Sequence, residues 1–419
     1  MFVHAEIPLL NWLVEGIPED FPVLLVDDTS IALQYLGAKA RRDSRAKVIG
    51  VTGSVGKTST KEMLRVCLSR DKLVHANVGS HNNAIGVPLT LANLGEQCDY
   101  LVAEMGMNHK GEILELTSLV RPHLALVTSI AETHIGNFAS VSEIADAKAE
   151  IFSGLEPPGK VVLNRDNPFY RQLWAAAEPI ARDCITFGRS SDATVKLVEL
   201  QTTDSEALLT AEIPGKTIRY RLTVLGSHWA YNSLGVIACL YALGEDVEAG
   251  AAALSEFELL AGRGRVDALC LGKKKYSLID ESYNASPPAV VAALRVLGEA
   301  KLMASGRRIA VLGDMMELGI QEQFLHENLR SEVIAARPSM VFTVGSRMLH
   351  LRKVLPAAMR GQHFDSAEDV IEPLLKEIRP YDVVLIKGSR SVGMSCIVSA
   401  LRSISREGEE VADMVKNAL

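Results

Sequence analysis

The chain has 419 residues, of which 48 % are hydrophobic and 23 % are charged, and its formal net charge is −7. This length allows two or three domains with substantial cores, and the acidic balance argues against a nucleic-acid-binding surface. No apolar run reaches the roughly 20 residues of a transmembrane helix, and the N-terminus lacks a signal-peptide pattern. The six cysteines have neither disulfide-like nor metal-site spacing, so we expect a cytoplasmic protein.

Residues 1–46 carry the weakest signals. A strand is expected at residues 23–26, a helix at 31–42 and a linker at 41–47. This stretch is too short for an independent domain, so we expect it to pack on the residues that follow.

Residues 47–68 predict a strand, a glycine-rich turn and a helix. Apolar residues at 48, 49 and 51 precede Gly53 and Gly56, and apolar residues then recur at helical spacing. Backbone N–H groups of such a turn can surround phosphate oxygens, while Lys57 adds a positive charge and the Thr58 hydroxyl can bind Mg²⁺. The strict Walker A spacing is not met, because Val51 stands where that pattern has its first glycine. A turn that binds nothing is the alternative, but it would not need the Lys-Thr-Ser sequence at 57–59.

The rest of the chain alternates between strands and helices. In residues 47–261 we expect strands at 100–103, 124–127 and 161–163, an antiparallel insert between 193 and 225, and a helix at 229–243. After a Gly-Arg-Gly-Arg link, residues 262–419 have expected strands at 276–280, 308–312, 340–344 and 382–386. We therefore predict an α/β protein with a central, mostly parallel P-loop-type sheet domain and a C-terminal Rossmann-like domain, and a ligand between them.

Two candidate metal ligands follow strands of the first region. Glu104 stands at the carboxyl end of the strand at 100–103, where a carboxylate can hold the same Mg²⁺ as Thr58. The alternative is a solvated loop glutamate. His134 lies in a loop after the strand at 124–127, where a lone histidine is more often a surface residue, so its signal is weak.

Lys148 lies on the apolar face of an expected helix. Ile144, Ile151 and Phe152 are its neighbours at helical spacing, and acidic residues occupy the opposite face. Burying an ammonium without a partner is costly. Either the side chain extends past its neighbours to solvent, which the spacing alone favours, or the neutral amine reacts with CO₂ to form a metal-binding carbamate.

Further polar residues follow in the second half of the chain. His228 and Asn232 share one face at the start of a helix, where Asn232 could pair with an adenine ring or the two residues could stabilise the helix start. Polar clusters at 280–284, 313–319 and 387–390 each follow an expected strand. Three such clusters at one sheet edge are hard to explain by folding alone.

Together these segments resemble the Mur ligases. The resemblance extends over residues 23–402 and is carried, in order, by the segments 52–59, 82–90, 108–113, 147–152, 280–284, 313–319 and 387–390. Several motifs in the right order are far more specific than a phosphate loop alone.

The resemblance implies roles for individual residues. Lys57, His134 and an N6-carboxylated Lys148 would be catalytic, and two Mg²⁺ ions would be held by Thr58 with Glu104 and by His134 with Lys148. ATP would be bound by Gly53, Ser54, Gly56, Lys57, Thr58, Ser59, Asn232, Arg265 and Asp280. The substrate would be contacted by Asn82, Asn83, Asn108 and His109.

The members that the chain resembles most join D-alanyl-D-alanine to UDP-N-acetylmuramoyl-tripeptide, through an acyl phosphate, in peptidoglycan synthesis. The resemblance implies this reaction, and we expect a monomer. A folate or polyamide ligase, or a nucleotide-binding paralogue without ligase activity, are the alternatives. Family members carry an N-terminal domain that binds the uridine diphosphate, and residues 1–46 match only its end, so we expect a fragment or a misplaced start codon.

Overall fold

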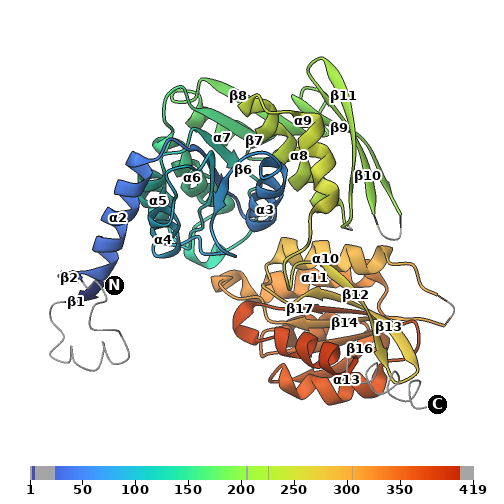
Figure 1. Ribbon diagram of the computed structural model, residues 1–419. Coiled ribbons are helices and arrows are strands. Elements are labelled where there is room, and N and C mark those ends of the chain that lie inside the picture. The colour runs from blue at the N-terminus through green and yellow to red at the C-terminus, as the bar shows by residue number, and fades with distance from the viewer. Residues whose placement is uncertain (1, 5–23, 204–205, 225, 304, 406–419) are drawn as a thin grey trace, which may run out of the picture.

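The structure is a computed structural model that describes residues 2–4, 24–203, 206–224, 226–303 and 305–405. Two sheets organise the chain (Figure 1). The nine-stranded sheet has the order β11-β10-β9-β8-β7-β6-β3-β5-β4, and the six-stranded sheet has the order β12-β13-β17-β14-β15-β16. We call each sheet with its helices the large unit and the small unit. The predicted α/β class and the two sheets are confirmed.

The large unit contains most of the expected elements. Its strands are β3 (Lys47–Thr52), β4 (Val74–Ala76), β5 (Tyr100–Glu104), β6 (Leu124–Val127), β7 (Lys160–Asn164), β8 (Asp183–Gly188), β9 (Val195–Thr202), β10 (Ala207–Ile213) and β11 (Lys216–Leu222). Its helices are α3 (Lys57–Leu68), α4 (Gly86–Ala92), α5 (Glu112–Val120), α6 (Val141–Ala149), α7 (Tyr170–Ala177), α8 (Ser227–Leu243) and α9 (Val247–Ala253). Its 3-10 turns are η1 (Ile135–Asn137), η2 (Glu150–Gly154) and η3 (Leu254–Glu256).

Strands β3 to β8 are parallel, and the central strands β3, β5, β6 and β7 are buried on both faces. Successive residues of β3 point to opposite sides: Val48 packs in the same cluster as Ile144 of α6, and Ile49 packs with Met63 of α3. This double burial explains why these strands are apolar runs in the sequence. Strands β9, β10 and β11 pair antiparallel, and Ile213 faces Lys216 across the turn at 214–215. The predicted antiparallel insert is confirmed.

The small unit is a second, mostly parallel sheet. Its strands are β12 (Arg265–Leu271), β13 (Lys274–Glu281), β14 (Arg308–Gly313), β15 (Met340–Val344), β16 (Arg360–Phe364) and β17 (Val383–Lys387). Its helices and turns are α10 (Pro287–Glu299), η4 (Gly319–Gln321), α11 (Glu322–Ala336), α12 (Met348–Val354), η5 (Ala357–Met359), η6 (Glu368–Val370), α13 (Ile371–Glu377) and η7 (Arg390–Val392), and residues 395–405 are also helical. Strand β12 was not expected, because its start reads as part of the Gly-Arg-Gly-Arg link.

The N-terminal elements are β1 (Phe2–His4), β2 (Leu24–Val26) and α2 (Thr29–Asp43), and β1 pairs with β2. The linker expected at residues 41–47 is wrong, since helix α2 continues to Asp43 and β3 starts at Lys47. Arg41 is buried and donates to the carbonyl oxygens of Val120 and Arg121 at 2.7 and 2.8 Å. Helix α2 therefore packs on the large unit, as expected.

No helix within the described ranges combines the length and the apolar character that crossing a bilayer requires.

Candidate active site

The turn between β3 and α3 has the backbone of a phosphate-binding loop. Gly53 (φ +147°) and Gly56 (φ +85°) adopt conformations that side chains disfavour, and a Cβ on Gly53 would lie 1.9 Å from the Oγ1 atom of Thr128. The Lys57 ammonium donates to the carbonyl oxygen of Gly53 at 2.7 Å. The first N–H groups of α3 have no partner inside the helix, so the loop can hold an anion there.

Two serines of this motif have different surroundings. The Ser54 hydroxyl donates to the carbonyl oxygen of Ala131 at 3.0 Å and accepts from its N–H at 2.9 Å. It therefore ties the phosphate loop to the segment that leads to His134. Ser59 is buried within α3.

Glu104 ends β5 beside the phosphate loop and is fully buried, so the interpretation as a solvated loop residue is wrong. Its Oε1 atom accepts hydrogen bonds from Thr58 Oγ1 at 3.1 Å and from Asn82 Nδ2 at 2.6 Å. Its Oε2 atom is buried and has no hydrogen-bond partner among the described residues. A buried carboxylate oxygen without a partner is costly, and an oxygen-seeking cation such as Mg²⁺ fits it together with the Thr58 hydroxyl.

Asn77 fixes the backbone of Glu104, and sequence reasoning missed it. Its Oδ1 atom accepts from the N–H of Glu104 at 2.6 Å, and its Nδ2 atom donates to the carbonyl oxygen of Glu104 at 3.3 Å. A lone asparagine after the short strand β4 gives no signal in the sequence. The neighbouring asparagine pattern at 82–83 was the closest clue.

Lys148 is buried inside α6, with only 1 % of its surface exposed. The interpretation that its side chain reaches solvent is therefore wrong. Burial holds the pKa of Lys148 well below its ordinary value, and the nearby charge of Lys57 lowers that pKa further. Both effects favour a neutral amine at this position. The mutual influence of the two lysines also means that Lys148 lies near the phosphate loop.

His134 lies where the two units touch. Its Nδ1 atom bonds the carboxylate of Glu317, and the Gly136 N–H donates to the Glu317 carbonyl oxygen at 2.9 Å. A Cβ on Gly136 would lie 2.5 Å from the backbone nitrogen of Gly319, so the backbones can meet only because both residues are glycine. Burial lowers the pKa of His134, the Glu317 carboxylate raises it, and the charge of Lys57 lowers it. His134, Lys57 and Lys148 therefore influence one another electrostatically.

The described residues near the phosphate loop do not form a conventional metal-binding cluster of acidic, histidine or cysteine side chains. Within the described part of the chain, no group of three or more His, Cys, Asp or Glu side chains is arranged to hold a metal ion. The predicted ligand set combines a hydroxyl, a carboxylate, an imidazole and a lysine instead.

The link between the units presents Arg263, not Arg265, to the phosphate loop. The Arg263 guanidinium donates to Ser80 Oγ at 2.8 Å, and Ser80 Oγ lies 3.4 Å from Thr58 Oγ1. Arg265 pairs with Asp267 at 2.7 Å, and its side chain is 59 % exposed. The sequence offered two arginines in one short link, and its pattern could not tell which one faces the loop.

Asp280, the other residue predicted to contact the nucleotide from this region, is buried at the end of β13. Its carboxylate accepts from the Gly262 N–H at 3.1 Å and from the Ser282 hydroxyl at 2.6 Å, and it pairs with Arg402 at 3.0 Å. It therefore fixes the geometry of the link.

A cavity of about 820 Å³ lies between the two units and opens next to the phosphate loop. Its lining includes Val55 of the loop, His228 and Asn232 of α8, Asp166, and Arg295 of α10. The Asn232 amide lies against Gly56, since a Cβ on that glycine would lie 2.4 Å from Asn232 Oδ1. A cavity that begins at a phosphate loop has the size and the polar groups to take the rest of a nucleotide.

The residues predicted to contact substrate fall into two groups. Asn82 bonds Glu104, as described, whereas the Asn83 side chain accepts from the N–H groups of Ile85 and Gly86 at 3.2 and 2.9 Å and so stabilises the start of α4. Asn108 and His109 are exposed in the loop before α5. The Asn108 carbonyl oxygen accepts from Asn137 at 3.1 Å, which brings that loop next to η1.

The polar clusters of the small unit lie at one sheet edge, as expected. Strand β17 pairs in parallel with both β13 and β14, so Lys387 faces Glu281 on one side and Leu312 on the other. The buried Lys387 ammonium bonds the Glu281 carboxylate at 3.2 Å and the Asn284 carbonyl oxygen at 3.0 Å.

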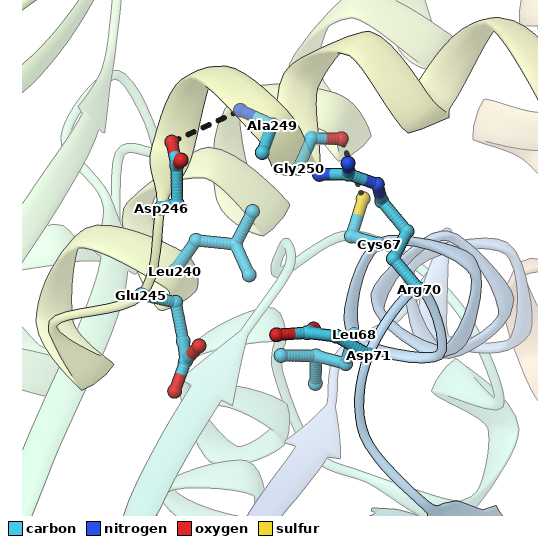
Figure 2. Close-up of a pocket in the computed structure, with 9 residues that line it drawn as sticks. All are labelled: Cys67, Leu68, Arg70, Asp71, Leu240, Glu245, Asp246, Ala249 and Gly250. Carbon is cyan, nitrogen blue, oxygen red and sulfur yellow. Dashed lines mark hydrogen bonds between the residues drawn. The ribbon is translucent and has the colours of Figure 1, made fainter.

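A second, smaller cavity of about 240 Å³ lies behind the far end of α3 (Figure 2). Cys67 lies in its wall and donates to the Gly250 carbonyl oxygen at 3.2 Å. Burial raises the pKa of the Cys67 thiol to about 12, so the thiol is unreactive. This cavity is separate from the phosphate loop.

Comparison with known proteins agrees with this arrangement. Residues 51–240 match the family described as Mur ligase middle domain, and residues 264–390 match the one described as Mur ligase, glutamate ligase domain. The chain is 34 % identical to the UDP-N-acetylmuramoyl-tripeptide--D-alanyl-D-alanine ligase of Rickettsia prowazekii, over 90 % of this chain and 82 % of that protein. It is also 34 % identical to the Escherichia coli ligase of the same name, over 91 % and 83 %.

Solved structures give the same result. MurF from Acinetobacter baumannii superposes with a TM-score of 0.82 and 28 % identity, over 90 % of this chain and 82 % of that one. A MurF ligase from Thermotoga maritima in complex with ADP has a TM-score of 0.78 over 94 % and 87 %, and at 24 % identity it supports the fold. The matches to known sequences, the fold and the phosphate loop all agree, and they show that this chain belongs to the Mur ligase family.

Proposed function

We propose that the chain is an ATP-dependent, ADP-forming ligase that joins D-alanyl-D-alanine to UDP-N-acetylmuramoyl-tripeptide in peptidoglycan synthesis. The observation that carries the proposal is the buried Glu104 carboxylate next to Thr58 of a phosphate loop, whose Oε2 atom has no hydrogen-bond partner in the described part of the chain. Relatives that carry this activity in their name cover the same residues at 34 % identity. We place the reaction in the cytoplasm, and we expect a monomer.

The reaction has two steps. An oxygen of the tripeptide carboxylate bonds to the γ-phosphorus of ATP while the bond from that phosphorus to ADP breaks, which gives an acyl phosphate. The amine of D-alanyl-D-alanine then attacks the acyl carbon, loses a proton, and the carbon–oxygen bond to phosphate breaks through a tetrahedral intermediate. Catalysis of such a transfer consists mainly of positioning and of charge stabilisation.

The phosphate loop supplies the first part of that stabilisation. The N–H groups at the start of α3 bind phosphate oxygens, and Lys57 exchanges its bond to the Gly53 carbonyl oxygen for one to the transferred phosphoryl group. Burial and the charge of Arg263 lower the pKa of Lys57, and the Glu104 carboxylate raises it. Glu104 therefore helps to keep the ammonium protonated. Arg263 adds a second cation from the link, whereas the family resemblance implied a nucleotide contact by Arg265.

Magnesium ions, when bound, neutralise the negative charge that the phosphoryl oxygens share. Thr58 and Glu104 would hold one ion. His134 and Lys148 would hold the second, with Lys148 present as a carbamate. To form it, the neutral Nζ atom bonds to the carbon of CO₂ and gives up a proton, and the resulting carboxylate supplies the oxygens that a lysine lacks.

The remaining assignments concern binding. Asn232, at the mouth of the cavity between the units, would contact the nucleotide from α8. Asn82 and the exposed residues Asn108 and His109 would face the tripeptide substrate, while Asn83 supports this segment by starting α4.

Phosphate release tests the proposal. The protein is mixed with ATP, Mg²⁺, D-alanyl-D-alanine and UDP-N-acetylmuramoyl-tripeptide, and each component is omitted in turn. We expect phosphate only when all are present, together with a product whose mass equals the two substrates joined less one water. Release that depends on a folate or another carboxylate instead would support a different Mur-type ligase. ATP binding without any turnover would refute ligase activity.

A further inference from the structure

Lys61 is a buried cation one turn into α3. None of its surface is exposed, and its ammonium donates to the carbonyl oxygens of Asn77 and Gly79 at 2.5 and 2.7 Å. Its third contact is the Glu62 carboxylate at 2.8 Å. Burying a lysine is costly unless its charge is compensated, and an apolar side chain could fill the same space in a helix. The two carbonyl groups that converge on Lys61 belong to one loop, residues 77–83, which we call the asparagine loop.

The asparagine loop contacts both predicted ligands of the first magnesium ion. The Asn77 side chain bonds both the N–H and the carbonyl oxygen of Glu104, and Asn82 donates to the Glu104 carboxylate at 2.6 Å. Ser80 lies 3.4 Å from the Thr58 hydroxyl and accepts from Arg263 at 2.8 Å. Without the bonds from Lys61, the asparagine loop could shift, and all of these contacts would be weakened.

We propose that Lys61 is a positioning residue for the magnesium site: by binding the asparagine loop to α3, its ammonium fixes Thr58 and Glu104 relative to each other. Lys61 itself contacts neither the reacting groups nor the cation. Its charge acts through the loop, because a cation can hold two backbone carbonyl groups together and a hydrocarbon side chain cannot. The inference rests on the proposed function, since it needs the magnesium site.

Metal binding without turnover tests this role. Lys61→Met keeps the length and apolar volume of the side chain and removes the ammonium. Free Mn²⁺ is measured by electron paramagnetic resonance in the presence of saturating ADP, and ADP affinity is measured separately in EDTA. We expect the variant to bind Mn²⁺ about tenfold more weakly, a change of about 1.4 kcal/mol, with its ADP affinity in EDTA unchanged.

Lys160→Met is the matched control. Lys160 also donates to a backbone carbonyl oxygen, that of Ala242 at 2.7 Å, but at the start of β7 rather than in the active site. It should leave Mn²⁺ binding unchanged. Equal Mn²⁺ affinities of Lys61→Met and Lys160→Met would overturn the proposal. A loss of ADP affinity in EDTA by Lys61→Met would also overturn it, because that loss would indicate a merely structural role for the lysine in α3.

A second variant keeps the proposal testable if Lys61→Met does not fold. Ser80 is only half-buried, so Ser80→Ala should fold normally, and it removes the contact between the asparagine loop and Thr58. It should weaken Mn²⁺ binding several-fold, and unchanged Mn²⁺ affinity would refute the role of the loop. Wild-type protein that binds ADP but no Mn²⁺ would instead refute the proposed function itself.

Discussion

Replacing Lys148 gives the sharpest test of the site, because this lysine is buried and lies near Lys57. Lys148→Ala removes the amine that would become the carbamate. Loss of one group that stabilises transition-state charge typically lowers kcat by about 10²–10³-fold, or roughly 3–4 kcal/mol. We expect a loss of this size in phosphate release, with ATP affinity reduced much less, since the phosphate loop is unchanged.

Chemical rescue distinguishes the carbamate from a simple packing role. In Lys148→Ala the deleted side-chain atoms should leave a buried space beside α6. Pentanoate matches the missing chain and places its carboxylate where the carbamate oxygens would lie, so it should restore part of the activity. Pentylamine, which has the same number of carbon atoms and no carboxylate, is the control. Equal rescue by both compounds, or wild-type activity without either, would refute the carbamate.

The same residue predicts a pH-dependent stability. Because the pKa of Lys148 is lowered on folding, the unfolded chain binds the extra proton below pH 10.5, and this lysine destabilises the fold increasingly as the pH falls towards its folded value. Lys148→Met should therefore be more stable than the wild type at neutral pH in CO₂-free buffer. The difference should shrink by up to about 1.4 kcal/mol per pH unit as the pH rises, and urea unfolding measures it. A constant difference between pH 7 and 10 would contradict the depressed pKa.

Other variants test neighbouring parts of the site. Wild-type protein with ADP should gain about 2.7 kcal/mol of unfolding free energy from Mg²⁺ at 100 times its Kd, and Glu104→Gln should gain none; an equal gain in urea unfolding would exclude Glu104 as a ligand. Gly136→Ala should reduce kcat by about fivefold, because its methyl group meets Gly319 and costs the inter-unit hydrogen bond of about 1 kcal/mol, and unchanged kcat would mean that this contact is not used in turnover. Arg263→Met should weaken ATP binding by about 1.5–3 kcal/mol in calorimetry whereas Arg265→Met should not, and the reverse order would restore the assignment made from sequence.

Much of the fold could be predicted because buried parallel strands are apolar on both faces. The short apolar runs at β5, β6 and β7 are typical of buried parallel strands. The turn at 214–215 separates two segments of alternating polarity, as antiparallel strands require. Strand β12 could not be found in the same way. It begins at Arg265, within a polar link, and it is stabilised as an edge strand by pairing with β13.

The site was harder to predict from the sequence, because the spacing of apolar residues shows which face of a helix is buried but not how deeply a side chain on that face is buried. The apolar neighbours of Lys148 were identified, yet whether its ammonium could reach water depends on the elements packed against α6, which are η2, α7 and α5. In the sequence, Lys61 cannot be distinguished from an exposed lysine on a helix. Only the structure shows that the carbonyl groups of the asparagine loop bind its ammonium. Likewise, Arg263 and Arg265 differ only by the turn that Gly264 makes between them, which a sequence pattern does not resolve.

In the proposed reaction, the bond between His134 and Glu317 would make metal binding by His134 depend on the arrangement of the two units. A neutral imidazole that donates from Nδ1 to a carboxylate is left with its lone pair on Nε2, and such an orienting carboxylate is the usual companion of a metal-binding histidine. Here that carboxylate comes from the opposite sheet. Without Glu317, the His134 imidazole would lose the carboxylate that orients it, so the proposed second metal site would be complete only where the two units meet.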